Sequence, residues 1–126
     1  MKTLFATIIL AGIFSCQYHN PAFKSVSVEA YERIIADSSV VRLDVRTAKE
    51  FAEGHIPNAV NIDVLHPNFI KKALATIPRN RTIAVNCRSG KRSKTAADLL
   101  AKKGYKVVEL DSGFKGWITD GNYIVK

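Results

Sequence analysis

The sequence predicts an α/β fold built on a largely parallel sheet. Short apolar runs rich in β-branched residues alternate along the chain with segments of helical periodicity. The segments between successive runs are long enough for crossover helices, which place neighbouring strands parallel. The chain has 126 residues, a length typical of one domain. We therefore expect a single domain with a central sheet.

Four segments are predicted strands. Each is short and apolar, and β-branched residues recur among them. They are residues 40–45 (VVRLDV), 59–64 (AVNIDV), 82–86 (TIAVN) and 105–110 (YKVVEL). Each gap between them, and the chain on either side, has room for a helix.

Five segments are predicted helices, because apolar residues recur at helical spacing between capping and stop residues. Ser27 caps the first. The second has a capping box, in which Thr47 is the cap and Glu50 its partner, and Gly54 ends it. The segments are residues 25–37, 47–54, 66–78, 91–104 and 112–121.

The composition narrows the classes of partner. The formal net charge is +8, with 47% hydrophobic and 24% charged residues, which is ordinary for a globular protein apart from the basic balance. A basic chain can bind nucleic acid, a membrane surface or small anions. The basic-aromatic interleaving of single-strand binders and the Cys/His spacing of zinc sites are both missing from the sequence. We therefore expect no nucleic-acid partner and no metal.

The first residues predict an export signal. Lys2 precedes an apolar run, residues 4–14, which is shorter than the ~20 residues that span a bilayer and matches the core of a secretory signal. Residues 13–16 (IFSC) resemble the lipobox of bacterial lipoproteins, in which the cysteine becomes the lipidated N-terminus. A plain signal peptide that is cleaved nearby is the alternative.

The lipobox resemblance implies a domain organisation. Residues 1–15 are the signal peptide, Cys16 carries the lipid, residues 16–24 are a tether, and residues 25–126 form the domain. It also implies a location on the periplasmic side of the bacterial cell envelope. Gln17, which follows the cysteine, favours the outer membrane. Cys87 is then the one free thiol of the mature chain, and such a thiol in an oxidising compartment is buried or used.

Cys87 is the second residue of the segment NCRSGKRS, residues 86–93. It follows a predicted strand and precedes a predicted helix, where ligands of parallel sheets bind. The free N–H groups of the first helical turn, together with Arg88, Lys91 and Arg92, favour a thiolate and can hold an anion beside it. The alternative is an inert core cysteine before a solvated helix start.

Two chemistries use such a loop. Phosphatases with a cysteine nucleophile need the pattern C-x-x-x-x-x-R, whereas here Arg92 is the fifth residue after Cys87 and Ser93 stands at the phosphatase position. The shorter ring fits one added sulfur atom better than a phosphoryl group. A phosphatase or arsenate reductase of the same fold is therefore the less favoured interpretation.

Two long blocks carry a family resemblance. LDVRTAKEFAEGHIPNAVNI, residues 43–62, and NCRSGKRSKTAADLLAKKGYKVVELDSGFKGW, residues 86–117, resemble the two signatures of the single-domain rhodaneses. The resemblance covers about residues 25–120. It implies a central five-stranded, mainly parallel sheet with helices on both faces, and no metal or organic cofactor.

The same resemblance implies sulfur transfer. The thiolate attacks the outer sulfur of thiosulfate or a related small anionic donor, and a cysteine persulfide forms. Cyanide or a thiol, which can belong to a protein, then accepts the sulfur. A non-enzymatic sulfane-sulfur carrier, which exchanges only with a partner protein, is the alternative.

The resemblance also implies roles within the loop. Cys87 is the nucleophile, and the backbone after it donates hydrogen bonds to the persulfide. Lys91 and Arg92 attract the anionic donor, and Ser93 donates a hydrogen bond from the first helical turn. The predicted substrate-binding residues are Arg88, Ser89, Gly90, Lys91, Arg92 and Ser93.

Four further residues have predicted positions. Asp44 and Arg46 lie at the carboxyl end of a strand and are candidates for active-site support. A structural role is favoured, in which Arg46 pairs with Glu50 and Asp44 holds the neighbouring loop. His55 is expected in a structural turn, and Trp117 in the core.

Overall fold

The computed structural model describes residues 22–126. Cys16, the predicted signal peptide and residues 16–21 of the predicted tether lie outside the described residues. Within residues 22–126, no helix combines the length and the apolar character needed to cross a membrane.

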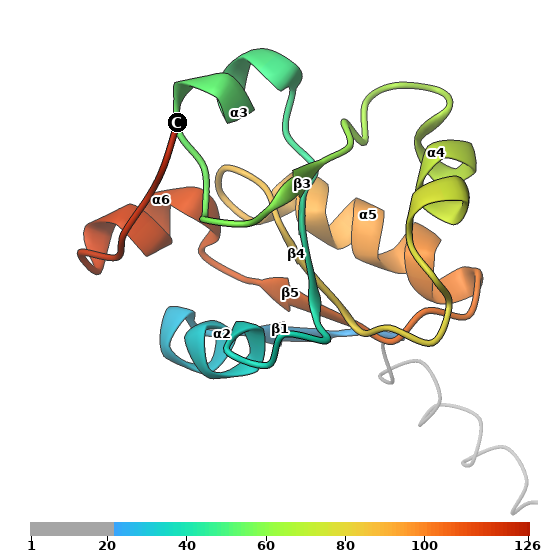
Figure 1. Cartoon of the computed structure of the whole chain (residues 1–126), viewed down its shortest axis with the longest axis horizontal. Coiled ribbons are helices and arrows are strands. Elements are labelled where there is room, and N and C mark those ends of the chain that lie inside the picture. Colours follow the sequence, from blue (N-terminus) through green and yellow to red (C-terminus); the bar gives the residue numbers. More distant parts are fainter. Residues whose placement is uncertain (1–21) are drawn as a thin grey trace, which may run out of the picture.

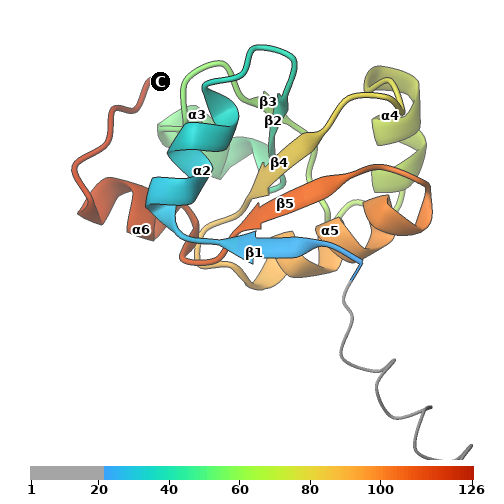
Figure 2. The same ribbon diagram turned by 90° about the horizontal axis from the view of Figure 1, so that it is seen from below.

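Five parallel strands form one sheet, in the order β1-β5-β4-β2-β3. Figure 2 shows β4, β5 and β1 side by side with their carboxyl ends at the same edge. The predicted α/β fold class is thereby confirmed. The strands are β1 (Lys24–Val26), β2 (Val41–Asp44), β3 (Val60–Asn61), β4 (Ile83–Asn86) and β5 (Val107–Leu110).

Within residues 22–126, four helices connect successive strands and a fifth follows the last strand (Figure 1). The predicted caps of the first two are confirmed. The hydroxyl of Ser27 accepts from the Ala30 N–H, and Thr47 and Glu50 form the capping box. The helices are α2 (Val28–Ile35), α3 (Ala48–Glu53), α4 (Phe69–Thr76), α5 (Lys91–Lys102) and α6 (Gly113–Thr119).

The first strand was not among the four predicted from apolar runs. β1 pairs with β5, with Ser25 opposite Glu109, and it begins at Lys24, the last residue of the predicted tether. Two of its three residues are exposed, so its sequence carries no apolar alternation. β3 is also shorter than predicted, since only Val60–Asn61 pair with β2.

The sheet has a core on each face. Buried residues of α4 and α5 pack on one face, and buried residues of α2 and α6 pack on the other. Ile83 and Val85 of β4 face α5, whereas Ala84 faces α2, as strand alternation requires. The same alternation directs Cys87, which follows β4, toward the α5 side.

Two residues with predicted structural roles are held by local contacts. The His55 ring stacks on Phe51, with centroids 3.6 Å apart, and its Nδ1 lies 2.8 Å from the Phe51 carbonyl oxygen. Trp117 is buried in the core edge-on to Tyr31, and its indole N–H donates to the Tyr123 carbonyl. Both lie where the sequence predicts.

Candidate active site

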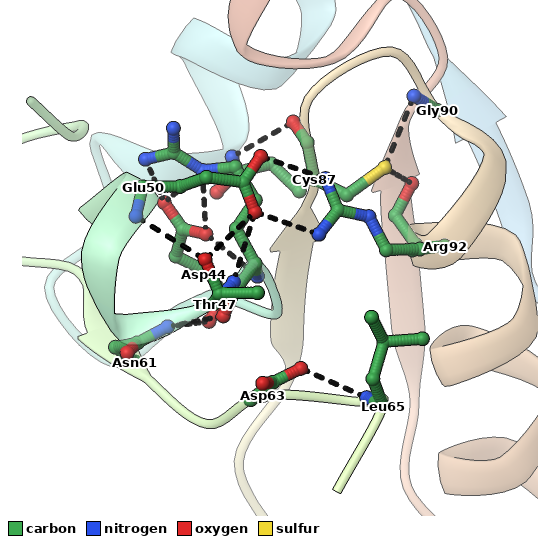
Figure 3. A network of polar contacts seen from close by, with 12 residues as sticks. Asp44, Thr47, Glu50, Asn61, Asp63, Leu65, Cys87, Gly90 and Arg92 are labelled. Carbon is green, nitrogen blue, oxygen red and sulfur yellow. Dashed lines mark hydrogen bonds and ion pairs between the residues drawn. The ribbon is translucent and has the colours of Figure 1, made fainter. Parts of the chain in front are cut away.

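Cys87 stands at the carboxyl end of β4, directly before the loop that enters α5. The residue is 1% exposed. Its sulfur accepts a hydrogen bond from the Gly90 N–H at 3.1 Å, and its S–H donates to Ser93 Oγ at 3.3 Å (Figure 3). Among residues 22–126 it is a free cysteine. The loop therefore directs one backbone donor and one hydroxyl at the sulfur.

The first turn of α6 holds this loop in place through backbone hydrogen bonds. The Phe114 N–H donates to the Cys87 carbonyl at 2.8 Å, and the Lys115 N–H donates to the Arg88 carbonyl at 3.0 Å. Gly113 has a φ of +66°, and a Cβ there would collide with the Arg88 carbonyl. Helix N–H groups that would otherwise lack partners thus fix the backbone of the nucleophile and of the residue after it.

Gly90 is the N-cap of α5 and has a φ of +99°. A Cβ at this position would collide with the carbonyl oxygen of Asp111. A glycine is required both for the left-handed conformation and for this close approach. The tight turn is what brings the Gly90 N–H to the sulfur.

The three predicted cations of the loop have different environments. Arg88 and Lys91 are exposed, and neither makes an ion pair with another residue in the part of the chain that the structure describes. Arg92 makes a two-pronged ion pair with Glu50 of α3, at 2.8 and 2.9 Å. Only two of the three cations therefore offer an uncompensated charge.

The ion pair changes the pKa of both Glu50 and Arg92. Hydrogen bonds from Arg92 are the main cause that lowers the pKa of Glu50 to about 2, against the opposing effect of burial. The pKa of Arg92 is raised, chiefly by its hydrogen bonds to Glu50, with smaller contributions from the charges of Cys87 and Asp63. The Arg92 guanidinium thus lies within electrostatic reach of the sulfur while it is bound to a carboxylate.

Arg46 pairs with Asp44, so the predicted ion pair between Arg46 and Glu50 is wrong. Arg46 Nη2 lies 2.7 Å from Asp44 Oδ2, and the guanidinium covers the Phe114 ring at 4.3 Å. It also donates to the Gly54 carbonyl, which ends α3. Both charged side chains are buried, and neither hydrogen-bonds to the sulfur. They join β2 to the end of α3, a structural role.

Glu109 on β5 is a buried carboxylate that the sequence analysis did not single out. It is 0% exposed. It accepts from Ser93 Oγ at 2.5 Å and from Ser25 Oγ at 2.6 Å, and Lys94 Nζ lies 3.3 Å from it. The only sequence signal for it is one charged residue inside the apolar run VVEL. The hydroxyl of Ser93 therefore donates to Glu109 and not to the sulfur.

Lys94 links this carboxylate to the surface. Its ammonium donates to Asp111 Oδ1 at 2.8 Å and to the Gly90 carbonyl at 3.1 Å. Burial opposes its charge, but hydrogen bonds to Asp111 and the nearby charge of Glu109 outweigh burial and raise the pKa of Lys94.

No group of three or more metal-binding side chains occurs among residues 22–126.

The chain is similar to known proteins of one family. A family model described as a rhodanese-like domain matches residues 27–120. A sulfurtransferase of Allochromatium vinosum is 33% identical over 102 residues, which cover 79% of this chain and 92% of that protein. The chloroplastic thiosulfate sulfurtransferase 16 of Arabidopsis thaliana is 31% identical over 111 residues, which cover 80% and 90%. A crystal structure of a rhodanese-related protein from Thermoplasma volcanium has a TM-score of 0.70 and 29% identity, and the match covers 82% of this chain and 98% of that chain.

Proposed function

Because the chain belongs to the family of rhodanese-like domains, we propose that it is a sulfurtransferase that works through a persulfide on Cys87. It takes sulfane sulfur from thiosulfate or a related anionic donor and passes it to a thiophilic acceptor. Relatives named as sulfurtransferases match most of its length. The observation that carries the proposal is the Gly90 N–H, held by a turn that only glycine can make and directed at the Cys87 sulfur.

The reaction has two half-reactions. The Cys87 thiolate attacks the outer sulfur of thiosulfate, the sulfur–sulfur bond of the donor breaks, and sulfite leaves with the bonding electron pair. Cyanide or a thiolate then attacks the outer sulfur of the persulfide. Thiocyanate or a new persulfide leaves, and the Cys87 thiolate is restored. Such a covalent intermediate predicts ping-pong kinetics.

The loop supplies what these steps require. The N–H groups between Arg88 and Arg92 stabilise negative charge on sulfur, as oriented backbone donors do for other anions. Arg88 and Lys91 are exposed on the surface of the loop and first helical turn beside Cys87, so their charges raise the local concentration of an anionic donor. The proposal needs no metal and no organic cofactor.

Intact mass spectrometry tests the proposal. Incubation with thiosulfate should add the mass of one sulfur atom to the wild-type protein, and cyanide should remove it. Cys87→Ser, which keeps a small polar side chain in place, should gain no mass. A wild-type protein that never gains sulfur from thiosulfate or from a persulfide donor would rule out the chemistry.

A sulfane-sulfur carrier is the second candidate function. The ion pair between Arg92 and Glu50 favours the carrier function. Glu50 compensates the charge of Arg92, one of the two cations predicted to attract a small anionic donor. Such a carrier would form the persulfide on Cys87 from a protein donor and show negligible steady-state turnover with thiosulfate and cyanide. Measurable turnover lost in Cys87→Ala supports the enzyme instead.

We also propose that the chain is exported and anchored through a lipid on Cys16, on the periplasmic side of the cell envelope. The apolar run of residues 4–14 and the lipobox-like IFSC support this. Cys16→Ser should release the protein from the membrane fraction, whereas the matched substitution Cys87→Ser should leave it there. Unchanged fractionation of Cys16→Ser would rule out the lipid anchor.

A further inference from the structure

The Cys87 sulfur is the first member of a buried chain of hydrogen bonds. Its S–H donates to Ser93 Oγ at 3.3 Å, and the Ser93 hydroxyl donates to Glu109 Oε2 at 2.5 Å. All three side chains are buried, with the nucleophile on one side of Ser93 and a carboxylate on the other. The sulfur-transfer steps described above make no use of Glu109.

The direction of this chain follows from the number of protons. A serine hydroxyl has one proton to donate, and a carboxylate can only accept. The bond from Ser93 to Glu109 is short and charge-assisted, so it holds that proton more strongly than a sulfur atom can. Ser93 consequently presents lone pairs to Cys87. A thiol can donate to these lone pairs, whereas a thiolate faces them without a proton between.

Glu109 is surrounded by groups that stabilise its charged form. Ser25 and Ser93 donate to it, and the Lys94 ammonium lies 3.3 Å from it. Hydrogen bonds and a nearby cation both favour the ionised state of a carboxyl group. The carboxylate is for that reason a poor acceptor for the proton of Cys87, and its negative charge opposes a second negative charge on the sulfur.

We propose that Glu109 is a positioning residue that, through Ser93, holds the resting Cys87 side chain as a thiol. The inference rests on the proposed function only in that Cys87 is the sulfur-accepting nucleophile. When Cys87 ionises, the thiol proton leaves to water, and the thiolate faces the lone pairs of Ser93, because the Ser93 proton stays in the bond to Glu109. A nucleophile held in this way reacts slowly with oxidants and alkylating agents until its surroundings change.

Other charged groups surround the sulfur and are unchanged in Glu109→Gln and Ser93→Ala, the two variants that test the proposal. They bias the ionisation of Cys87 equally in wild type and variant, so a difference between the two reports the substituted residue. These groups are Arg88 and Lys91 in the loop and first turn, Arg92 and Lys94 on α5, Glu50 on α3, Asp44 and Arg46 at the end of β2, Asp63 after β3, Asp111 after β5, and Lys115 on α6.

The test is the pH dependence of alkylation of Cys87 by iodoacetamide, a small uncharged probe, in the full chain. Glu109→Gln keeps the size of the side chain and removes its charge. It should shift the profile to lower pH and raise the rate near pH 6 by about threefold or more, because the thiolate is no longer opposed. Ser93→Ala removes the acceptor of the thiol proton and should shift the profile in the same direction.

The sign of each shift decides the matter. If Glu109 instead takes the thiol proton through Ser93, or if Ser93 donates to the thiolate, both variants shift to higher pH and the proposal fails. Unchanged profiles also overturn it. Should Glu109→Gln fail to fold, Ser93→Ala alone decides by the same sign.

A matched control separates the hydrogen bond from net charge. Asp111→Asn removes a carboxylate that also contacts Lys94 but does not touch Ser93. It should move the alkylation profile far less than Glu109→Gln, and an equal shift would overturn the proposal. Alkylation needs no sulfur donor, so failure here is distinguishable from failure of persulfide formation in the mass measurement.

Discussion

Arg92 and Glu50 form a two-pronged ion pair that joins the first turn of α5 to α3, with N–O distances of 2.8 and 2.9 Å. Glu50 also accepts from the Thr47 N–H, as the partner in the capping box of α3. One carboxylate therefore caps a helix and compensates a cation of the candidate active-site loop (Figure 3). The predicted anion attraction by Arg92 competes with this contact.

Glu50→Gln should strengthen the binding of thiosulfate. Glutamine replaces glutamate in capping boxes, so α3 keeps its cap, while the charge of Arg92 is no longer compensated. We expect the KM for thiosulfate to fall about three- to tenfold with little change in kcat, as for a charge that acts on binding alone. Steady-state kinetics with thiosulfate and cyanide measure this.

Glu53→Gln is the matched control for that measurement. Glu53 ends α3 and carries the same charge, but it makes no ion pair with Arg92. Its substitution should leave the KM within about twofold of the wild-type value, because a more distant exposed charge is screened. Equal effects of the two substitutions would show that net charge, not the release of Arg92, lowers the KM.

Acid should remove the contribution of the ion pair to stability. The hydrogen bonds that Arg92 donates to Glu50 are the main reason that the pKa of Glu50 falls from 4.5 to about 2 on folding. A carboxyl group with a lowered pKa stabilises the fold fully above its unfolded pKa, and this stabilisation is lost as pH falls through the folded pKa. The pair therefore contributes fully above about pH 5 and progressively less toward pH 2.

Urea unfolding of wild type and Glu50→Gln, from neutral pH to about pH 2, checks this prediction. The neutral glutamine does not titrate, so the difference in the free energy of unfolding should be constant down to about pH 5 and then shrink. A difference that stays constant to the lowest pH would mean that the charge of Glu50 contributes nothing to the fold.

Lys91→Ala should weaken the binding of anionic donors without slowing the chemistry. Lys91 begins α5, is exposed and makes no ion pair with the described residues 22–126, so its charge is available to the solvent. We expect the KM for thiosulfate to rise about threefold to tenfold with kcat unchanged. This is the result expected when the lost interaction stabilises the bound substrate and the transition state equally.

The same lysine has a control at the other end of its helix. Lys103 follows the last turn of α5 and is also exposed. Lys103→Ala should leave the KM unchanged, and added salt should narrow the gap between Lys91→Ala and wild type because exposed charges are screened. A salt-independent rise in KM, or an equal rise in Lys103→Ala, would contradict a role for the Lys91 charge.

Most of the sheet and all five helices within residues 22–126 could be predicted, because each has a local pattern of apolar residues, and two of the helices also begin with a side-chain cap. The capping box of Thr47 and Glu50 is an example, since two residues three positions apart specify it. β1 could not be predicted in this way. Its strand conformation comes from pairing with β5, more than eighty residues away, and not from its own mostly exposed residues.

In the candidate site, too, features set by local sequence could be predicted, whereas contacts between distant elements could not. The position of Cys87 between strand and helix follows from local sequence. The need for glycine at position 90 does not, because it depends partly on the approach of the Asp111 carbonyl from another part of the chain. The partners of Arg46 and Arg92 do not, because the choice between Asp44 and Glu50 depends on how β2, α3 and α5 meet in space. The role of Glu109 could not be predicted either, because the serines that contact it, Ser93 and Ser25, come from two other elements.

The turn at Gly90 should be more sensitive to substitution than its backbone conformation alone requires. Gly90 and Gly104 have nearly equal φ angles, +99° and +97°. A Cβ at Gly104 would meet nothing within 4 Å, whereas at Gly90 it would collide with the Asp111 carbonyl. The two positions therefore separate the cost of a left-handed residue from the cost of a steric clash.

Gly104→Ala should lower the free energy of unfolding by about 1 kcal/mol and keep sulfur transfer, since the strain is local. Gly90→Ala should lower it by at least about 2 kcal/mol and reduce kcat/KM for thiosulfate about tenfold or more, because the loop must shift and carry its N–H away from the Cys87 sulfur. Urea unfolding and steady-state kinetics on both variants check this. If Gly90→Ala matches Gly104→Ala in stability and activity, then the close approach to Asp111 does not hold the loop, and the directed N–H is not what makes Cys87 reactive.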